Sequence, residues 1–137
     1  MAHIKNLKFL KNHKDLVDEN YGMVAVPTFS DKMDKDLAKL FKSQNKKGKV
    51  GELVFEIDNN SRIVYYGLGS SSEKTPENFR RAAGEVVGYA LKHKYSDIAV
   101  ECPVSNEGDY FCQAFAEGLI LSSCLLYTSD AADDMQC

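Results

Sequence analysis

The segment 75–91 carries the pattern that most constrains the fold. Thr75 is a favourable N-cap, and Pro76 stands at the first helical position, where a missing N–H costs nothing. Apolar side chains then recur at helical spacing on one face: Phe79, Ala82, Ala83, Val86, Val87, Ala90 and Leu91. This predicts a long amphipathic helix. Gly84 and Gly88 lower its helix propensity, so we expect close packing against a sheet or a second helix to compensate.

Short β-rich runs occupy much of the remaining chain. The predicted strands are 3–9, 23–27, 53–57, 62–66 and 98–102. The turn-forming run Asp58–Ser61 separates the third strand from the fourth and predicts a hairpin. Pro103 ends the last strand because it cannot donate a backbone hydrogen bond.

Two further helices are predicted. Ser30 and Asp31 offer an N-cap for a short helix whose apolar face carries Met33, Leu37, Leu40 and Phe41. Residues 109–123 form the other helix, with an apolar face of Phe111, Ala114, Phe115, Gly118 and Leu119. Strands followed by amphipathic helices predict an α/β domain with a mixed sheet and helices on its faces.

The last segment of the chain, 124–137, differs in character from the rest. Its text resembles a conceptual translation of a sequencing-library transposon-end adapter, and such scars are excluded from fold reasoning. We therefore expect a domain over 1–123, incomplete at its C-terminal end, followed by a stretch that is not a domain.

Charge and hydropathy exclude several classes of partner. Three of the 20 acidic residues lie in that last segment, which leaves 17 against 17 Lys and Arg. A neutral body gives no electrostatic case for nucleic acid or an anionic membrane. The polar, Lys-rich N-terminus is not a secretory signal, and no apolar stretch is long enough to span a bilayer.

The search for metal ligands and nucleophiles assigns no residue. His3, His13 and His93 have no partner at a useful spacing, and His93 at a helix end is expected to be a surface cation. Cys102 and Cys112 lack CxxC spacing, so we expect two reduced, partly buried thiols in a cytosolic protein, with Cys112 packing beside its neighbours. No catalytic, metal-binding or cofactor-binding residue is predicted.

The loop 67–72 carries the most suggestive chemistry. Gly67-Leu-Gly69-Ser-Ser-Ser72 follows a strand and precedes a helix, a geometry that can hold phosphate on backbone N–H groups. A dinucleotide fingerprint requires a third glycine where Ser72 stands, and the lysine of a P-loop is absent. A tight structural turn is the favoured interpretation, and phosphate binding is the alternative.

Three motifs in order resemble the leucyl aminopeptidase (cytosol aminopeptidase) family, specifically its N-terminal domain. They are Val64-Tyr-Tyr-Gly-Leu-Gly69, Asn78-Phe-Arg-Arg-Ala-Ala-Gly84 and Gln113-Ala-Phe-Ala-Glu-Gly-Leu119. The resemblance covers residues 23–123 and is strongest from Val64 onward. Family members usually continue with a segment such as Tyr-Arg-Phe where this chain has Cys124.

The resemblance implies a macrodomain-like α/β fold and a role in assembling hexamers with a separate catalytic domain. Family members release N-terminal amino acids from peptides, using two divalent metals, zinc or manganese, held by that other domain. None of its catalytic or metal positions has a counterpart here, so the resemblance implies an inactive, metal-free, cytoplasmic fragment. The alternative function is a free-standing macrodomain-like module that binds ADP-ribose or another phosphate ligand. Loss of the downstream chain would expose a sheet edge and the apolar face of the last helix, so we expect poor solubility.

Overall fold

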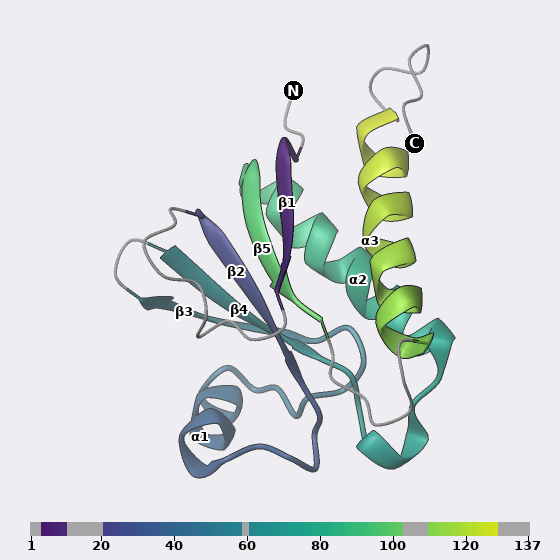
Figure 1. Cartoon of the computed structure of the whole chain (residues 1–137). Helices are drawn as coiled ribbons and strands as arrows, with labels where there is room; N and C mark the ends of the chain where they lie inside the picture. Colours follow the sequence, from purple (N-terminus) through teal and green to yellow (C-terminus); the bar gives the residue numbers. More distant parts are fainter. Residues whose placement is uncertain (1–3, 11–20, 59–60, 103–109, 129–137) are drawn as a thin grey trace.

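A five-stranded mixed sheet forms the centre of the computed structural model, which describes residues 4–10, 21–58, 61–102 and 110–128 (Figure 1). The strands are β1 (Asn6–Leu10), β2 (Met23–Thr28), β3 (Leu53–Asp58), β4 (Ser61–Gly67) and β5 (Asp97–Glu101). Their spatial order is β1-β5-β2-β4-β3. Neighbouring strands are parallel except β3 and β4, which pair antiparallel as the predicted hairpin. The α/β class and the mixed sheet are therefore confirmed.

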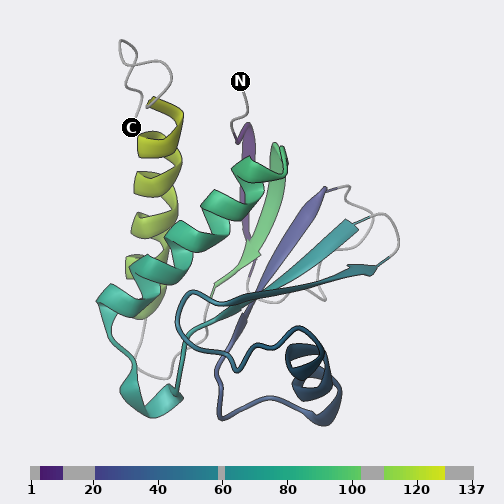
Figure 2. The same cartoon turned by 180° about the vertical axis from the view of Figure 1, so that it is seen from behind.

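Helices lie on both sides of this sheet. The long helices α2 (Pro76–Lys92) and α3 (Tyr110–Thr128) pack side by side on one face, and the short helix α1 (Lys35–Ser43) lies on the other side, near the end of β2 (Figures 1 and 2). A short 3₁₀ turn, η2 (Ser71–Glu73), joins β4 to α2. Among the described residues, no helix has both the length and the apolar character needed to cross a bilayer.

Helix α2 forms as the local sequence predicts. Thr75 is its N-cap, with the side-chain Oγ1 accepting a hydrogen bond from the Asn78 N–H at 3.1 Å, and Pro76 is its first residue. Its predicted apolar face is buried at Phe79, Ala82, Ala83, Val86, Val87 and Ala90. Each large apolar side chain buried in this way contributes about 1.5–3 kcal/mol relative to exposure. Burial against the sheet and α3 thus adds tertiary stability to a helix that is already locally favoured.

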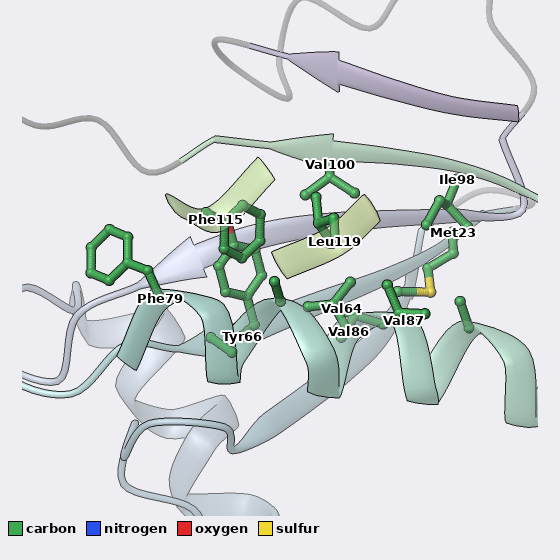
Figure 3. Close-up of a cluster of buried hydrophobic side chains, with 14 of the residues drawn as sticks. Met23, Val64, Tyr66, Phe79, Val86, Val87, Ile98, Val100, Phe115 and Leu119 are labelled. Atoms are coloured by element: carbon green, nitrogen blue, oxygen red, sulfur yellow. The ribbon is translucent and has the colours of Figure 1, made fainter. Parts of the chain in front are cut away.

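The main core lies between the sheet and the two long helices (Figure 3). Met23, Val64 and Ile98 contribute from three strands, and Phe115 and Leu119 contribute from α3; all five are fully buried. The ring of Tyr66 in β4 stacks on that of Phe115, with centroids 4.8 Å apart and planes 10° apart. A stack of this kind adds about 0.5–1.5 kcal/mol beyond the area that it buries.

The glycines of the helices do not all have the role that the sequence predicted. A Cβ on Gly118 of α3 would lie 2.9 Å from the Arg80 Cα, so this glycine is what lets α3 approach α2 closely. A Cβ on Gly84 would lie 3.3 Å from the Ser122 Oγ, which agrees with the expected close packing. A Cβ on Gly88 would meet nothing within 4 Å, so the expectation that close packing compensates for the low helix propensity of this glycine is wrong.

Two helix ends differ from the prediction. Asp34, rather than Ser30 or Asp31, caps α1 by accepting a hydrogen bond from the Leu37 N–H at 2.8 Å. Ser30 and Asp31 lie upstream of α1 because the chain first turns at the end of β2. Helix α3 begins at Tyr110 and continues to Thr128, beyond the predicted end at residue 123. The side chain of Phe111 lies outside the described part of the chain.

A smaller apolar cluster lies on the opposite face of the sheet. Val24, Val26 and Ala99 form it, with Tyr21, Ile63 and Tyr65 packed against them. Helix α1 approaches one end of this cluster, where Leu37 and Leu40 line a hollow of about 310 Å³ together with Val26 and Tyr65.

Strand β3 forms one edge of the sheet, and the side chain of Gln44 satisfies part of that edge. The Gln44 Nε2 donates to the Phe55 carbonyl at 2.8 Å, and the Phe55 N–H donates back to the Gln44 Oε1 at 3.3 Å. The amide side chain thereby imitates the peptide group of a neighbouring strand. Phe55 is 42% exposed and Ile57 is 71% exposed, so this edge presents apolar surface.

Candidate functional site

The carboxyl ends of β2, β4 and β5 meet at one edge of the sheet, which is where ligands bind in many open α/β folds. The predicted loop 67–72 lies at this edge, between β4 and α2. Cys102 directly follows β5, whose carboxyl end lies at the same edge. The structure therefore places two candidates from the sequence, the loop 67–72 and Cys102, at the edge where ligands most often bind in such folds.

A carboxylate of the chain itself is bound by the loop 67–72. The Ser71 N–H donates to the Asp31 Oδ1 at 2.9 Å, and the Ser71 Oγ donates to the Asp31 Oδ2 at 2.6 Å. These bonds, the side-chain one foremost, lower the pKa of Asp31 below its ordinary value of 3.8. Asp31 thus stands where an external anion would have to bind Ser71.

Several further backbone donors of this loop are also used within the fold. Leu68 N–H donates to the Thr28 carbonyl at 2.9 Å, and Gly69 N–H donates to the Gly48 carbonyl at 3.0 Å. Ser72 N–H donates to the Ser70 Oγ at 3.3 Å. A phosphate would have to displace these bonds and approach the negative charge of Asp31. The geometry therefore favours the structural interpretation of the loop over ADP-ribose or phosphate binding.

The two glycines of the loop serve packing. Gly69 has φ of 75°, which L side chains rarely adopt. A Cβ on Gly67 would lie 2.3 Å from the Lys49 carbonyl oxygen, so only glycine lets β4 pass this close to the turn 46–49. The Gly-x-Gly pattern here reflects a close backbone approach rather than a bound nucleotide.

The turn 46–49 forms a second anion cradle, which the sequence did not reveal. The Glu52 Oε1 accepts hydrogen bonds from the N–H groups of Lys47, Gly48 and Lys49 at 3.0, 2.9 and 2.8 Å. Burial opposes ionisation of Glu52, but the three N–H groups outweigh it, so its pKa lies below the ordinary value of 4.5. Successive N–H groups that converge on one oxygen are an anion-binding nest, and here the chain fills its own nest.

The structure brings together two cysteines that the sequence left apart. Cys102 and Cys112 are both half-buried and free, and they lie close enough for Cys112 to influence the pKa of Cys102. Burial first, and the neighbouring Cys112 second, raise the pKa of Cys102 to about 12. A nucleophilic cysteine requires the opposite shift, so Cys102 is not an activated nucleophile in this state.

The tyrosine beside these thiols is also held in its neutral form. Tyr66 is fully buried, and its hydroxyl donates to the Glu101 carbonyl at 2.5 Å. Burial above all, with the nearby Cys102, raises its pKa well above the ordinary value of 10.0. The phenol is therefore neither a base nor a nucleophile near neutral pH.

The one histidine in the described part of the chain lies at the end of a helix, and one hollow lies beside α1. His93 is exposed at the C-cap of α2 and lies against Tyr89, with ring centroids 4.3 Å apart; His3 and His13 lie outside the described residues. A hollow of about 450 Å³ beside α1 has a lysine rim formed by Lys42, Lys46 and Lys47. Within the described ranges, no three His, Cys, Asp or Glu side chains are grouped so that they could hold a metal ion.

Comparison with known proteins identifies the domain. The family model described as "Cytosol aminopeptidase family, N-terminal domain" matches residues 16–124. A solved mutant of tomato leucine aminopeptidase superposes with a TM-score of 0.67 at 18% identity, over 89% of this chain and 28% of that one.

Two structures of a second relative give the same result. The bottromycin maturation enzyme BotP, solved in complex with Mn, matches at a TM-score of 0.62 and 18% identity, over 75% of this chain and 23% of its own. Another BotP structure matches at 0.55 and 18% identity, over 75% of this chain and 23% of that one. No curated protein matches the chain by sequence.

The chain spans about a quarter of the length of these solved relatives. The family match covers most of the residues that carry the sheet and its helices, and the solved relatives share that fold. The chain belongs to the cytosol aminopeptidase family, through the N-terminal domain of that family.

Proposed function

We propose that this chain is the non-catalytic N-terminal part of a leucyl aminopeptidase-type metallopeptidase, whose whole protein releases N-terminal amino acids from peptides. The observation that carries the proposal is the family match over residues 16–124. The share of about a quarter of each solved relative supports it, because most of such a protein lies outside the region matched here.

The chemistry of the parent enzyme belongs, in this proposal, to its other domain. The parent uses two divalent metals, zinc or manganese, and the name of the related BotP structure records a complex with Mn. Such a metal pair polarises the peptide carbonyl and activates a water molecule. The carboxyl edge of the sheet in this chain instead carries Cys102 and Tyr66, whose pKa values are raised. It also carries Asp31 and Glu52, whose carboxylates are bound by the chain's own N–H and hydroxyl groups.

The partners of this domain are its own catalytic domain and further copies of the parent, as a cytoplasmic homo-hexamer. Exposed apolar surface supports an assembly role. Ile120 and Leu121 on α3 are 52% and 56% exposed, and Ile57 on the sheet edge is 71% exposed. Surfaces of this kind are commonly covered by another domain or subunit. The buried face of α3, which includes Phe115 and Leu119, is not among them, because it packs against α2 and the sheet.

Hydrolysis of leucine-p-nitroanilide by the purified chain, with added manganese or zinc, tests the proposal. We expect no turnover above that of the metal ion alone. A full-length leucine aminopeptidase, such as the tomato protein, is the positive control under the same conditions. Metal-dependent turnover that co-purifies with the chain would show that it carries catalysis itself and would overturn the proposal.

A further inference from the structure

Two thiols from different elements meet at the carboxyl edge of the sheet. Cys102 directly follows β5, and Cys112 lies in the first turn of α3, ten positions later in the chain. Both side chains are half-buried and free, and they lie close enough for Cys112 to influence the pKa of Cys102. A disulfide needs its sulfurs about 2.05 Å apart, so the two side chains must turn toward each other for the bond to form.

The buried Tyr66 contacts a neighbour of each cysteine. The carbonyl of Glu101, the residue before Cys102, accepts the hydrogen bond of the Tyr66 hydroxyl at 2.5 Å. Phe115, one helical turn after Cys112, stacks on the same Tyr66 ring at 4.8 Å (Figure 3). One fully buried tyrosine thus contacts the residue before Cys102 and the residue one turn after Cys112, which places both cysteines beside the same part of the core.

We propose that Cys102 and Cys112 are a reversible disulfide site that links the end of β5 to the first turn of α3. The oxidant is a small disulfide of the glutathione class. The thiolate of one cysteine attacks a sulfur of the small disulfide, forms a mixed disulfide and releases one small thiol. The second cysteine gives its proton to solvent, attacks the protein-bound sulfur and releases the second small thiol. The two cysteines lose two protons and two electrons, and the small disulfide gains them.

The rate of this reaction is set by the environment of the thiols. Because burial raises the pKa of Cys102 to about 12, its thiolate is scarce near neutral pH. Oxidation is therefore slow at pH 7 and speeds up with pH, by up to about tenfold per unit for the step in which Cys102 attacks. Once formed, the bond closes a short loop and restricts the unfolded chain, so it raises the thermal midpoint by about 5 °C or more.

Proteolytic cleavage after glutamate places the cysteines on separate peptides, so the masses of the peptides show which cysteines are linked. Cleavage after Glu101, Glu107 and Glu117 yields peptide 102–107 with Cys102, peptide 108–117 with Cys112, and peptide 118–137 with Cys124 and Cys137. The full chain is incubated with oxidised glutathione at about pH 8.5, near the pKa of an ordinary thiol, and then digested without reductant. We expect peptides 102–107 and 108–117 joined, lighter by two hydrogen atoms than their sum, and separated again by dithiothreitol.

Matched variants decide between this linkage and the alternatives. Cys102→Ser and Cys112→Ser each remove the joined pair and the rise in thermal midpoint, whereas Cys124→Ser leaves both unchanged. Peptide 102–107 joined to 118–137, or carrying only glutathione at equilibrium, would overturn the proposal. So would a thermal midpoint that rises equally in oxidised Cys102→Ser, because the stabilisation would then come from other thiols.

Discussion

Asp31 and Ser71 join the ends of two neighbouring parallel strands through one carboxylate that accepts two hydrogen bonds. The Ser71 N–H and Oγ donate to its two oxygens at 2.9 and 2.6 Å. Asp31 follows β2 and Ser71 follows β4, so the pair fastens the loop 67–72 to the end of β2. The carboxylate is therefore a structural anion at the edge where α/β domains commonly bind ligands.

Removal of this carboxylate is expected to destabilise the fold. Asp31→Ala should lower the urea midpoint at pH 7 more than Ser71→Ala, because the serine variant keeps the bond from its backbone N–H. The double variant should be no less stable than Asp31→Ala, because Asp31 is the shared acceptor. Equilibrium urea unfolding of the four proteins measures this coupling. Strictly additive losses would show that the two residues act separately.

The nest around Glu52 predicts a specific acid sensitivity. The pKa of Glu52 is lower in the folded chain than its ordinary value of 4.5, so its contribution is complete above that value and is lost as the pH falls through the folded pKa. Glu52→Gln should cost about 1–2 kcal/mol at pH 7, because a neutral oxygen accepts the three N–H bonds less strongly. Its unfolding free energy should also fall less than that of the wild type between about pH 5 and pH 3.

Unfolding in urea at a series of pH values measures both effects. Glu85→Gln, which removes the same charge from an exposed position on α2, is the matched control. Equal acid sensitivity of Glu52→Gln and the wild type would show that the nest does not bind an ionised carboxylate.

Two glycine substitutions on the packed helices should act in opposite directions. Gly118→Ala places a methyl group 2.9 Å from the Arg80 Cα and 3.0 Å from the Ala83 Cβ, so α3 must move away, at a cost of about 1–3 kcal/mol. Gly88→Ala meets nothing within 4 Å and improves helix propensity, so it should stabilise by about 0.5–1 kcal/mol. Thermal unfolding distinguishes the two. Stabilisation by Gly118→Ala would mean that the helices are not in close contact at this point.

The β3 edge should govern self-association. Gln44→Ala frees the N–H and carbonyl of Phe55, and we expect stronger association because an unpaired strand edge templates another strand. Ile57→Lys places a charge at a side chain that is 71% exposed, so it should weaken association and change stability by less than about 0.5 kcal/mol. Sedimentation velocity over a concentration series measures both. Association that is the same in all three proteins would place the contact elsewhere.

The elements that the sequence predicts correctly are those whose caps, turns and apolar patterns all lie within one short segment. The cap at Thr75, the proline at Pro76 and the apolar stripe all belong to one segment, and α2 forms where they predict it. The hairpin 53–66 is predicted equally well, because its turn and its two strands are adjacent in the chain. The cap of α1 was misplaced because Ser30, Asp31 and Asp34 are all good cap residues, and only the path of the chain after β2 selects Asp34.

The sequence by itself determined the α/β class, the order of elements and the amphipathic faces, because these depend on propensity and periodicity within single segments. Its three motifs also indicated the family, which the match over residues 16–124 confirms. Only the tertiary structure decided that the Asp31 carboxylate binds the loop 67–72 and that the Glu52 carboxylate binds the turn 46–49. It also decided that Cys102 and Cys112 lie near each other. Asp31 and Ser71 are 40 residues apart in the chain, and no local pattern encodes which distant partner a donor finds when strands align side by side.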